Sequence, residues 1–186
     1  MSQTNSPKEL LAQIKELEKQ ISVLKNRKKY GLVWEDKTED VVLECLENVP
    51  VLKEVKNRKV VIDNSLPDNL LIEGDNYHAL SVLNYTHKKS VDVVYIDPPY
   101  NTGAKNWRYN NDYVDGDDDW RHSKWVSYMN RRLLLAKKVL KEKGVLICAI
   151  DENEHANLGL LIKQIFTNYV VDCVTVVHNP RGVQGK

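Results

Sequence analysis

Four consecutive residues of this 186-residue chain combine a carboxylate, two prolines and an aromatic ring: Asp97-Pro98-Pro99-Tyr100. They follow the apolar run Val91–Ile96, so Asp97 is expected just beyond the end of a buried strand, where open parallel sheets bind ligands. The prolines restrict the backbone and remove two N–H donors, which makes the turn stiff and rich in acceptors. A carboxylate and a carbonyl can hold both hydrogens of an exocyclic amine on a nucleobase, and Tyr100 can stack on its ring. By itself the motif also fits a plain proline turn.

Further motifs surround this turn, at Lys29–Trp34, Leu71–Asn76, Asn101–Gly103, Trp120–Trp125 and Gly144–Glu154. Together with Asp97–Tyr100 they resemble the β-class DNA adenine-N6 methyltransferases, of the modification-subunit type found in type III restriction-modification systems. The resemblance runs from about residue 28 to the end of the chain. The chain is therefore identified as an amino-terminal fragment of such an enzyme.

The resemblance implies a role for each residue of the turn. In that family the aspartate and the first proline's carbonyl hold the target amine, which here means Asp97 and Pro98. Pro99 completes the catalytic motif, and Tyr100 stacks on a base that must first be flipped out of the duplex. Relatives that act on cytosine N4 usually have serine at the first position, and those that act on protein glutamine have asparagine, so Asp97 favours adenine in DNA.

The same resemblance implies the cofactor and the partners. The methyl donor is expected to be S-adenosylmethionine, the substrate double-stranded DNA, and a restriction subunit is a further candidate partner. Asp75, Asp97 and Asn101 are expected at the donor pocket, although Asp75 also suits an N-cap for a helix beginning near Asn76. Expected contacts to DNA or to the flipped base are Tyr100, Asn101, Arg121, Lys124 and His178, with solvated positions as the alternative for Arg121 and Lys124. Asp151, which follows another apolar run, suits either the rim of the site or acidic capping of the next helix.

The elements that must position these residues alternate between apolar runs and helical patterns. Strands are predicted at 70–72, 91–96, 145–150 and 170–177, and helical spacing is found at 79–83, 123–143 and 156–166. Gly144 is expected to end the long helix. This alternation predicts an α/β fold with a mostly parallel sheet and helices on both faces. With the resemblance, it implies a partial, Rossmann-like S-adenosylmethionine-dependent methyltransferase domain over residues 61–186.

Residues 1–29 are predicted to form an amphipathic helix with a coiled-coil seam, because apolar residues repeat in steps of four and three at Leu10, Ile14, Leu17, Ile21 and Leu24. The seam suits either pairing with another helix, including a homodimer, or packing on the protein's own body. Residues 30–60 are predicted to be a connector with a short helix.

Composition and charge limit the classes of protein to which the chain can belong. The formal net charge is +1, so DNA contacts must come from local groups, since no overall basic field exists. No apolar run is long enough to span a bilayer and no secretory leader is visible, so a cytoplasmic protein without membrane contact is expected. The three cysteines, Cys45, Cys148 and Cys173, are far apart and form no CxxC pair, which favours reduced thiols and no metal site.

No Gly-x-Gly turn occurs in the chain, although the donor pocket of this fold needs a glycine-rich turn after a strand. We therefore expect a truncated chain that by itself neither binds S-adenosylmethionine well nor methylates. The competing class is a non-catalytic module that binds DNA or a partner and uses its first helix for assembly.

Overall fold

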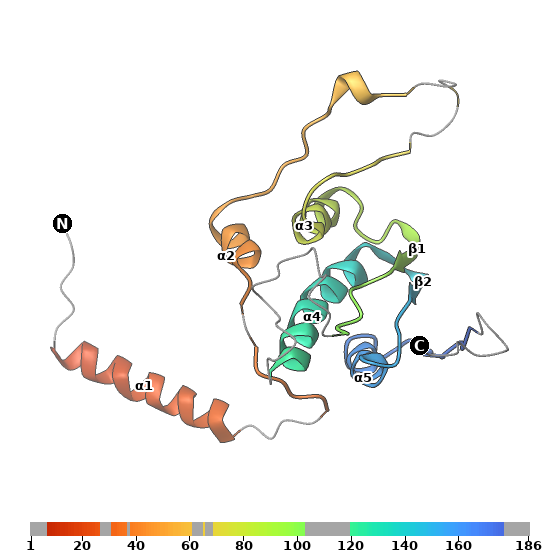
Figure 1. Ribbon diagram of the computed structural model, residues 1–186. Coiled ribbons are helices and arrows are strands. Elements are labelled where there is room, and N and C mark those ends of the chain that lie inside the picture. Colours follow the sequence, from red (N-terminus) through yellow and green to blue (C-terminus); the bar gives the residue numbers. More distant parts are fainter. Residues whose placement is uncertain are drawn as a thin grey trace. The chain divides into compact units, whose positions relative to one another are not determined.

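The computed structural model describes residues 7–26, 31–36, 38–60, 65, 69–102 and 120–176 (Figure 1). The chain divides into two compact units, residues 1–33 and 34–186. In the described part of the first unit the regular element is α1, whereas the second unit contains the strands and the other helices.

Helix α1 (Pro7–Asn26) lies inside the segment predicted to be helical. Its seam residues Leu10, Ile14, Leu17 and Ile21 are each about half exposed. The apolar stripe is thus open to solvent along its described side chains. Pairing through this stripe stays a prediction.

The sheet of the second unit consists, in the described part of the chain, of two parallel strands, β1 (Val91–Ile96) and β2 (Leu140–Cys148). The bounds of β1 are those predicted from its apolar run. Parallel neighbours need a crossover connection, and α4 (Arg121–Val139) lies between the two strands in the chain. The structure therefore confirms the α/β class with a parallel sheet.

Helix α4 is central to the helical layer and packs against both α3 (Asn76–Thr86) and α5 (His155–Ile165). Its residues Trp125, Met129 and Leu133, spaced by four, are fully buried because they form one face of the helix. The shorter α2 (Asp40–Glu47) packs against α3, and a single 3-10 turn, η1 (Lys56–Arg58), follows it. Among the described helices, none is both long enough and apolar enough to cross a membrane.

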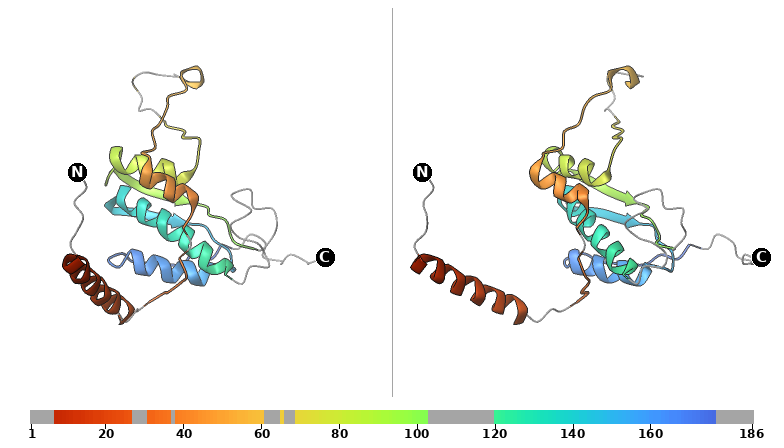
Figure 2. Two further views of the ribbon diagram at one scale, coloured as in Figure 1. Left: turned by 90° about the vertical axis from the view of Figure 1, so that its left-hand side faces the viewer. Right: turned by 60° about the vertical axis from the view of Figure 1, so that its left-hand side comes forward.

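The helices cover one face of the two-stranded sheet. Figures 1 and 2 show α3, α4 and α5 on the same side of β1 and β2. On the opposite face Val93 pairs with Val145 and Tyr95 with Ile147, and all four side chains are exposed. The sequence predicts helices on both faces, and in the described residues they cover one.

The boundary between α4 and β2 differs from the prediction. The helix ends at Val139 and the strand begins at Leu140, so a helix continuing to residue 143 and a strand starting at residue 145 are both wrong. The carbonyls of Lys138 and Val139 accept hydrogen bonds of 3.0 Å from the backbone N–H groups of Lys89 and Ser90. These tertiary donors satisfy the last carbonyls and so end the helix early.

Gly144 lies inside β2 and does not end a helix. A Cβ at this position would stand 2.7 Å from the side chain of Leu140 and 3.1 Å from the carbonyl oxygen of Asp92. The pairing of the strands is irregular at the same place, between Val91 and Val93. Glycine therefore allows the strands to approach where any side chain would separate them.

Two predicted strands are absent from the described residues, at 70–72 and at 170–176. Both segments are apolar but exposed: Leu71 is 94% accessible and Val170 is 89% accessible. A strand needs a hydrogen-bonded neighbour, and no strand of the described chain pairs with either segment. The apolar composition was therefore insufficient to predict pairing.

Candidate active site

Residues 97–101, here called the acceptor loop, continue directly from the end of β1. The hydroxyl of Tyr100 donates a hydrogen bond of 2.8 Å to Oδ1 of Asp97. This bond favours the protonated phenol and raises the pKa of Tyr100. The motif's aromatic residue therefore donates to one oxygen of the motif's carboxylate.

The acceptor loop is held from behind by α4. The indole N–H of Trp125, which is fully buried, donates a hydrogen bond of 2.7 Å to the carbonyl oxygen of Pro99. The carbonyl of Pro98 has no donor among the described residues, since neither a hydrogen bond nor another interaction involves it. Of the two proline carbonyls, that of Pro99 is thus used to fix the loop, and that of Pro98 has no donor within the described part of the chain.

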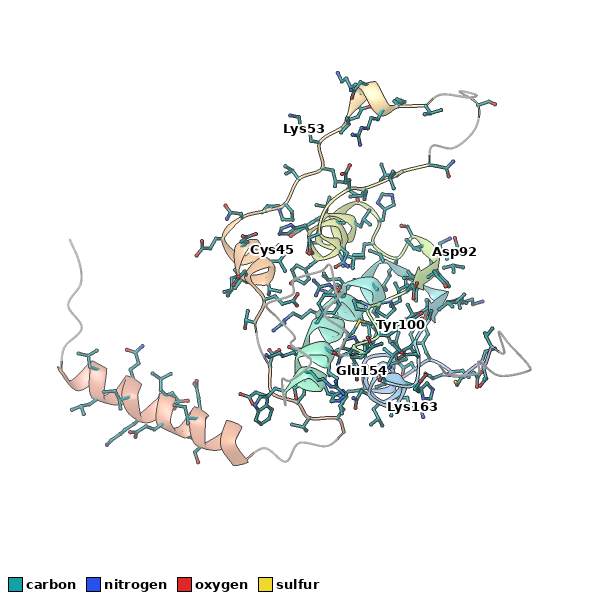
Figure 3. The ribbon with its side chains drawn as sticks, in the orientation of Figure 1. Cys45, Lys53, Asp92, Tyr100, Glu154 and Lys163 are labelled. Atoms are coloured by element: carbon teal, nitrogen blue, oxygen red, sulfur yellow. The ribbon has the colours of Figure 1, made fainter. Side chains whose placement is uncertain are left out.

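Asn101 ends the loop in a left-handed conformation, with φ of 57°. Its side chain is buried, and its Nδ2 donates to Oε1 of Glu154 and, at 3.5 Å, to the carbonyl of Arg121. Nδ1 of His122 lies 2.6 Å from the same oxygen of Glu154. Figure 3 labels Tyr100, which belongs to the acceptor loop, and Glu154, which immediately precedes α5.

A second aspartate lies in the turn at residues 74–76, here called the Asp75 turn. Oδ1 of Asp75 accepts a hydrogen bond of 2.7 Å from the backbone N–H of Tyr77 and so caps α3. Gly74 precedes it with a φ of 148°, which side chains rarely allow. The capping role weighed from the sequence is therefore observed, and the Asp75 side chain is 42% exposed.

A buried ion pair supports the Asp75 turn. The guanidinium of Arg132 donates 2.9 Å to Oε1 of Glu39 and 2.6 Å to Oδ1 of Asn76, and one of its nitrogens lies 3.7 Å from Asp75. It also stacks over the ring of Tyr128, 3.5 Å from the centroid. The pair joins the N-terminus of α2 to α4 and to the residue following Asp75.

Both aspartates face one open cavity of about 1370 Å³. Its lining includes Asp75, Tyr128 and Arg132 on one part and the residues 97–100 on another. This volume exceeds that of ordinary small-molecule sites, so the cavity has room for more than one ligand group. Cys148 is the last residue of β2 and pairs with Ile96; burial, reinforced by the charge of Asp97, raises the pKa of its thiol to about 12.

The structure brings together most of the residues singled out from the sequence. Asp75, Asp97, Pro98, Pro99 and Tyr100 line the cavity. Asn101, the last residue of the loop, is buried and is not among the residues that line the cavity.

Arg121 and Lys124 lie in the first turn of α4. Asp151 accepts from both the backbone and the side-chain nitrogen of Asn153 in the turn before α5. His178 and the acidic segment at 115–119 lie outside the described residues.

Four residues of the site were missed from the sequence: Glu39, Trp125, Arg132 and Glu154. Trp125 and Arg132 belong to the stretch after Trp120 that carries the family resemblance, but the sequence did not predict which polar groups they contact. Glu154 lies in the motif at residues 144–154, but the burial of Glu154 and Glu39 was not predicted, because a buried carboxylate and an exposed one look alike in sequence.

Residues 91–184 match the DNA methylase family, so the match includes β1, the acceptor loop and β2. The chain belongs to the DNA methylase family. The family match is consistent with the geometry, since the matched segment begins at the strand that carries Asp97.

Individual relatives show which members of the DNA methylase family the chain is similar to. The chain is 32% identical to the Mod subunit of the type III restriction-modification enzyme EcoPI of Escherichia phage P1, over 82% of the chain and 28% of that relative. It is 35% identical to the StyLTI Mod subunit of Salmonella typhimurium, over 64% of the chain and 22% of the relative. It is also 42% identical to the type II methyltransferase M.KpnI of Klebsiella pneumoniae, over 50% of the chain and 22% of the relative.

These similarities confirm the resemblance to type III modification subunits. The chain spans less than a third of the length of these relatives.

Proposed function

We propose that the protein containing this chain is a site-specific DNA methyltransferase that modifies N6 of adenine. One observation carries the proposal: the acceptor loop presents the Asp97 carboxylate and the Pro98 carbonyl, which accepts from no described residue, beside a cavity at the end of a parallel strand. Family membership and the modification-subunit relatives support the same activity.

The arrangement suits an amine that is a poor nucleophile. The lone pair of an exocyclic amine is delocalised into the base, and two acceptors that hold its hydrogens favour a more nucleophilic nitrogen. Asp97 and the Pro98 carbonyl are these acceptors. Tyr100 uses one acceptor site of the Asp97 carboxylate, which has about four, so the amine can bind Asp97 beside it. The Tyr100 ring lines the cavity, where a flipped base can stack on it.

The cofactor that this family implies is S-adenosylmethionine, which supplies the methyl group when bound. The described residues fit part of it: Asp75 lines the cavity, caps α3 with Oδ1 and is still partly exposed, so its carboxylate can accept from an amino group of the donor. Gly74 beside it leaves open space where a side chain would lie. The chain contains no Gly-x-Gly turn for the methionine portion.

Duplex DNA is the proposed partner, and the relatives' designation as Mod subunits supports a restriction subunit as a second one. Arg121 and Lys124 are proposed to contact DNA phosphates, because they lie in the first turn of the helix that holds the acceptor loop. A homodimer through α1 is proposed on its half-exposed seam.

The test uses the complete gene product that contains these residues. Methyl transfer from labelled S-adenosylmethionine to duplex DNA is measured, and the modified base is identified by mass spectrometry. Asp97→Ala should lower kcat by about a hundredfold to a thousandfold, as does removal of one preorganised hydrogen-bonding group in other enzymes. The matched control is Asp92→Ala, which removes an exposed carboxylate from β1 that pairs with Lys141 (Figure 3).

Three results would contradict the proposal. Unchanged kcat in Asp97→Ala would remove the carboxylate's role, and 4-methylcytosine as the only product would replace adenine by cytosine N4. Binding of DNA without any methyl transfer would favour the non-catalytic module.

A further inference from the structure

A polar cluster behind the acceptor loop is not used by the chemistry proposed above. It consists of Asn101, Arg121, His122 and Glu154, none of which lines the cavity. We propose that Glu154 is the positioning residue of the acceptor loop, acting through Asn101 to aim Asp97 and the Pro98 carbonyl at the target amine. This inference rests on the proposed function and deepens it.

The first argument is the burial of Glu154. Its side chain is 0% exposed, and a carboxylate removed from water is retained only where partners compensate for the lost hydration. Oε1 accepts from Nδ2 of Asn101, and Oε2 accepts from Nδ2 of Asn157 at 2.8 Å. Although Glu154 immediately precedes α5, its side chain makes no capping bond to that helix. One oxygen of Glu154 therefore binds the acceptor loop, and the other binds the side chain of Asn157 in the first turn of α5.

The second argument is the conformation of Asn101. Its positive φ is one that asparagine tolerates better than most residues, and its 6% exposed side chain is committed to the protein interior. The loop is thus fixed at two points beyond Asp97, at the Pro99 carbonyl by Trp125 and at Asn101 by Glu154. Two fixed points determine where the Pro98 carbonyl and the carboxylate stand. Reactive groups need such placement to within about 0.5 Å.

The third argument is the direction of the hydrogen bonds at His122. Nε of Arg121 donates to Nε2 of His122 at 3.3 Å, so Nε2 is the acceptor and Nδ1 carries the proton. Nδ1 then donates to Oε1 of Glu154. Two N–H donors, from His122 and Asn101, converge on one carboxylate oxygen. Glu154 consequently ties the loop to the first turn of α4, where Arg121 lies.

The experiment uses the complete gene product, with kcat and KM measured for DNA and for S-adenosylmethionine. Glu154→Ala should lower kcat by about a hundredfold with KM values nearly unchanged, because a small displacement of reacting groups has effects of this size. Glu154→Gln should recover most of kcat, since its amide oxygen can still accept from Asn101. The control is Glu152→Gln, an exposed carboxylate two residues earlier, with unchanged kcat.

A second substitution separates positioning from folding. Asn101→Gly keeps the positive φ but removes the side chain that Glu154 holds. Adding Glu154→Ala to Asn101→Gly should lower kcat no further, because both changes break the same contact. If Glu154→Ala does not fold, as judged by circular dichroism at the assay temperature, Asn101→Gly alone carries the test, with the same expected loss of kcat at nearly constant KM.

The outcomes are distinguishable. Loss of kcat with nearly constant KM, rescue by glutamine and non-additivity with Asn101→Gly support the inference. An active unsubstituted protein whose kcat changes less than about threefold in Glu154→Ala, or in which the two substitutions act additively, overturns this inference alone. An unsubstituted protein without methyl transfer overturns the proposed function, and the inference with it.

Discussion

The acceptor loop and the Asp75 turn each place an aspartate at the same cavity, but different interactions hold them. The acceptor loop follows a paired strand, and two hydrogen bonds hold it. The indole of Trp125 donates to the Pro99 carbonyl, and the side chain of Asn101 donates to Glu154. The Asp75 turn follows an exposed apolar segment that pairs with no described strand. It depends instead on its own helix cap and on the Arg132–Glu39 ion pair.

The difference shows two ways to hold a carboxylate at a ligand site. A proline-rich loop at a strand end has few conformations, so a few hydrogen bonds are enough to place it. A turn after an unpaired segment is not restricted in this way. Here the buried Arg132–Glu39 pair restricts it, although burial removes both charged groups from water. Substitutions at three positions test this comparison through urea-induced unfolding of the chain.

The largest decrease in the free energy of unfolding is expected for Arg132→Met. It leaves the buried carboxylate of Glu39 without its 2.9 Å partner, although Arg131 remains 3.3 Å from the same oxygen. We expect the free energy of unfolding to fall by about 3 kcal/mol, the lower end of the range for breaking a buried pair. The control Arg58→Met breaks an exposed pair with Glu73 and should change the free energy by less than about 1 kcal/mol. Equal losses in the two variants would show that burial of the pair does not matter.

A smaller loss is expected for Trp125→Phe. The ring largely refills the core, but the Pro99 carbonyl loses its donor, which should lower the free energy of unfolding by about 1–3 kcal/mol. The matched control is Trp34→Phe, because the indole nitrogen of Trp34 is buried with no hydrogen-bond partner among the described residues. A loss as large in Trp34→Phe would mean that indole volume, and not the hydrogen bond, stabilises the loop.

The smallest expected effect separates the two roles of Asp75. Asp75→Ala removes the cap of α3 and should cost about 1 kcal/mol, whereas Asp75→Asn keeps an acceptor for Tyr77 and should cost only a few tenths. In the complete gene product, Asp75→Asn should still weaken S-adenosylmethionine binding, measured by calorimetry, if the carboxylate contacts the donor. Unchanged affinity would leave Asp75 with the capping role alone.

The acceptor loop is also where prediction from sequence was most accurate. The apolar run that ends at Asp97 identified β1 with its observed bounds, because the following prolines cannot continue a strand ladder. The spacing of Trp125, Met129 and Leu133 likewise identified the buried face of α4. The end of α4 was predicted wrongly, since the donors that end it, Lys89 and Ser90, belong to a distant part of the chain.

The partners of buried polar groups were not predictable at all. Glu154 meets Asn101 across 53 positions of sequence and His122 across 32, and Arg132 meets Glu39 across 93. No local period relates such residues, so nothing in the sequence distinguished Glu154 from its exposed neighbour Glu152.

Local chemistry alone therefore determined the acceptor motif, the strand that presents it and the apolar face of the helix behind it, because backbone restriction and periodic burial act over a few residues. Tertiary structure decided which carboxylates are buried, which proline carbonyl stays available and where α4 ends. These outcomes depend on hydrogen bonds between segments far apart in the chain, and such bonds form only once packing has excluded water from both partners.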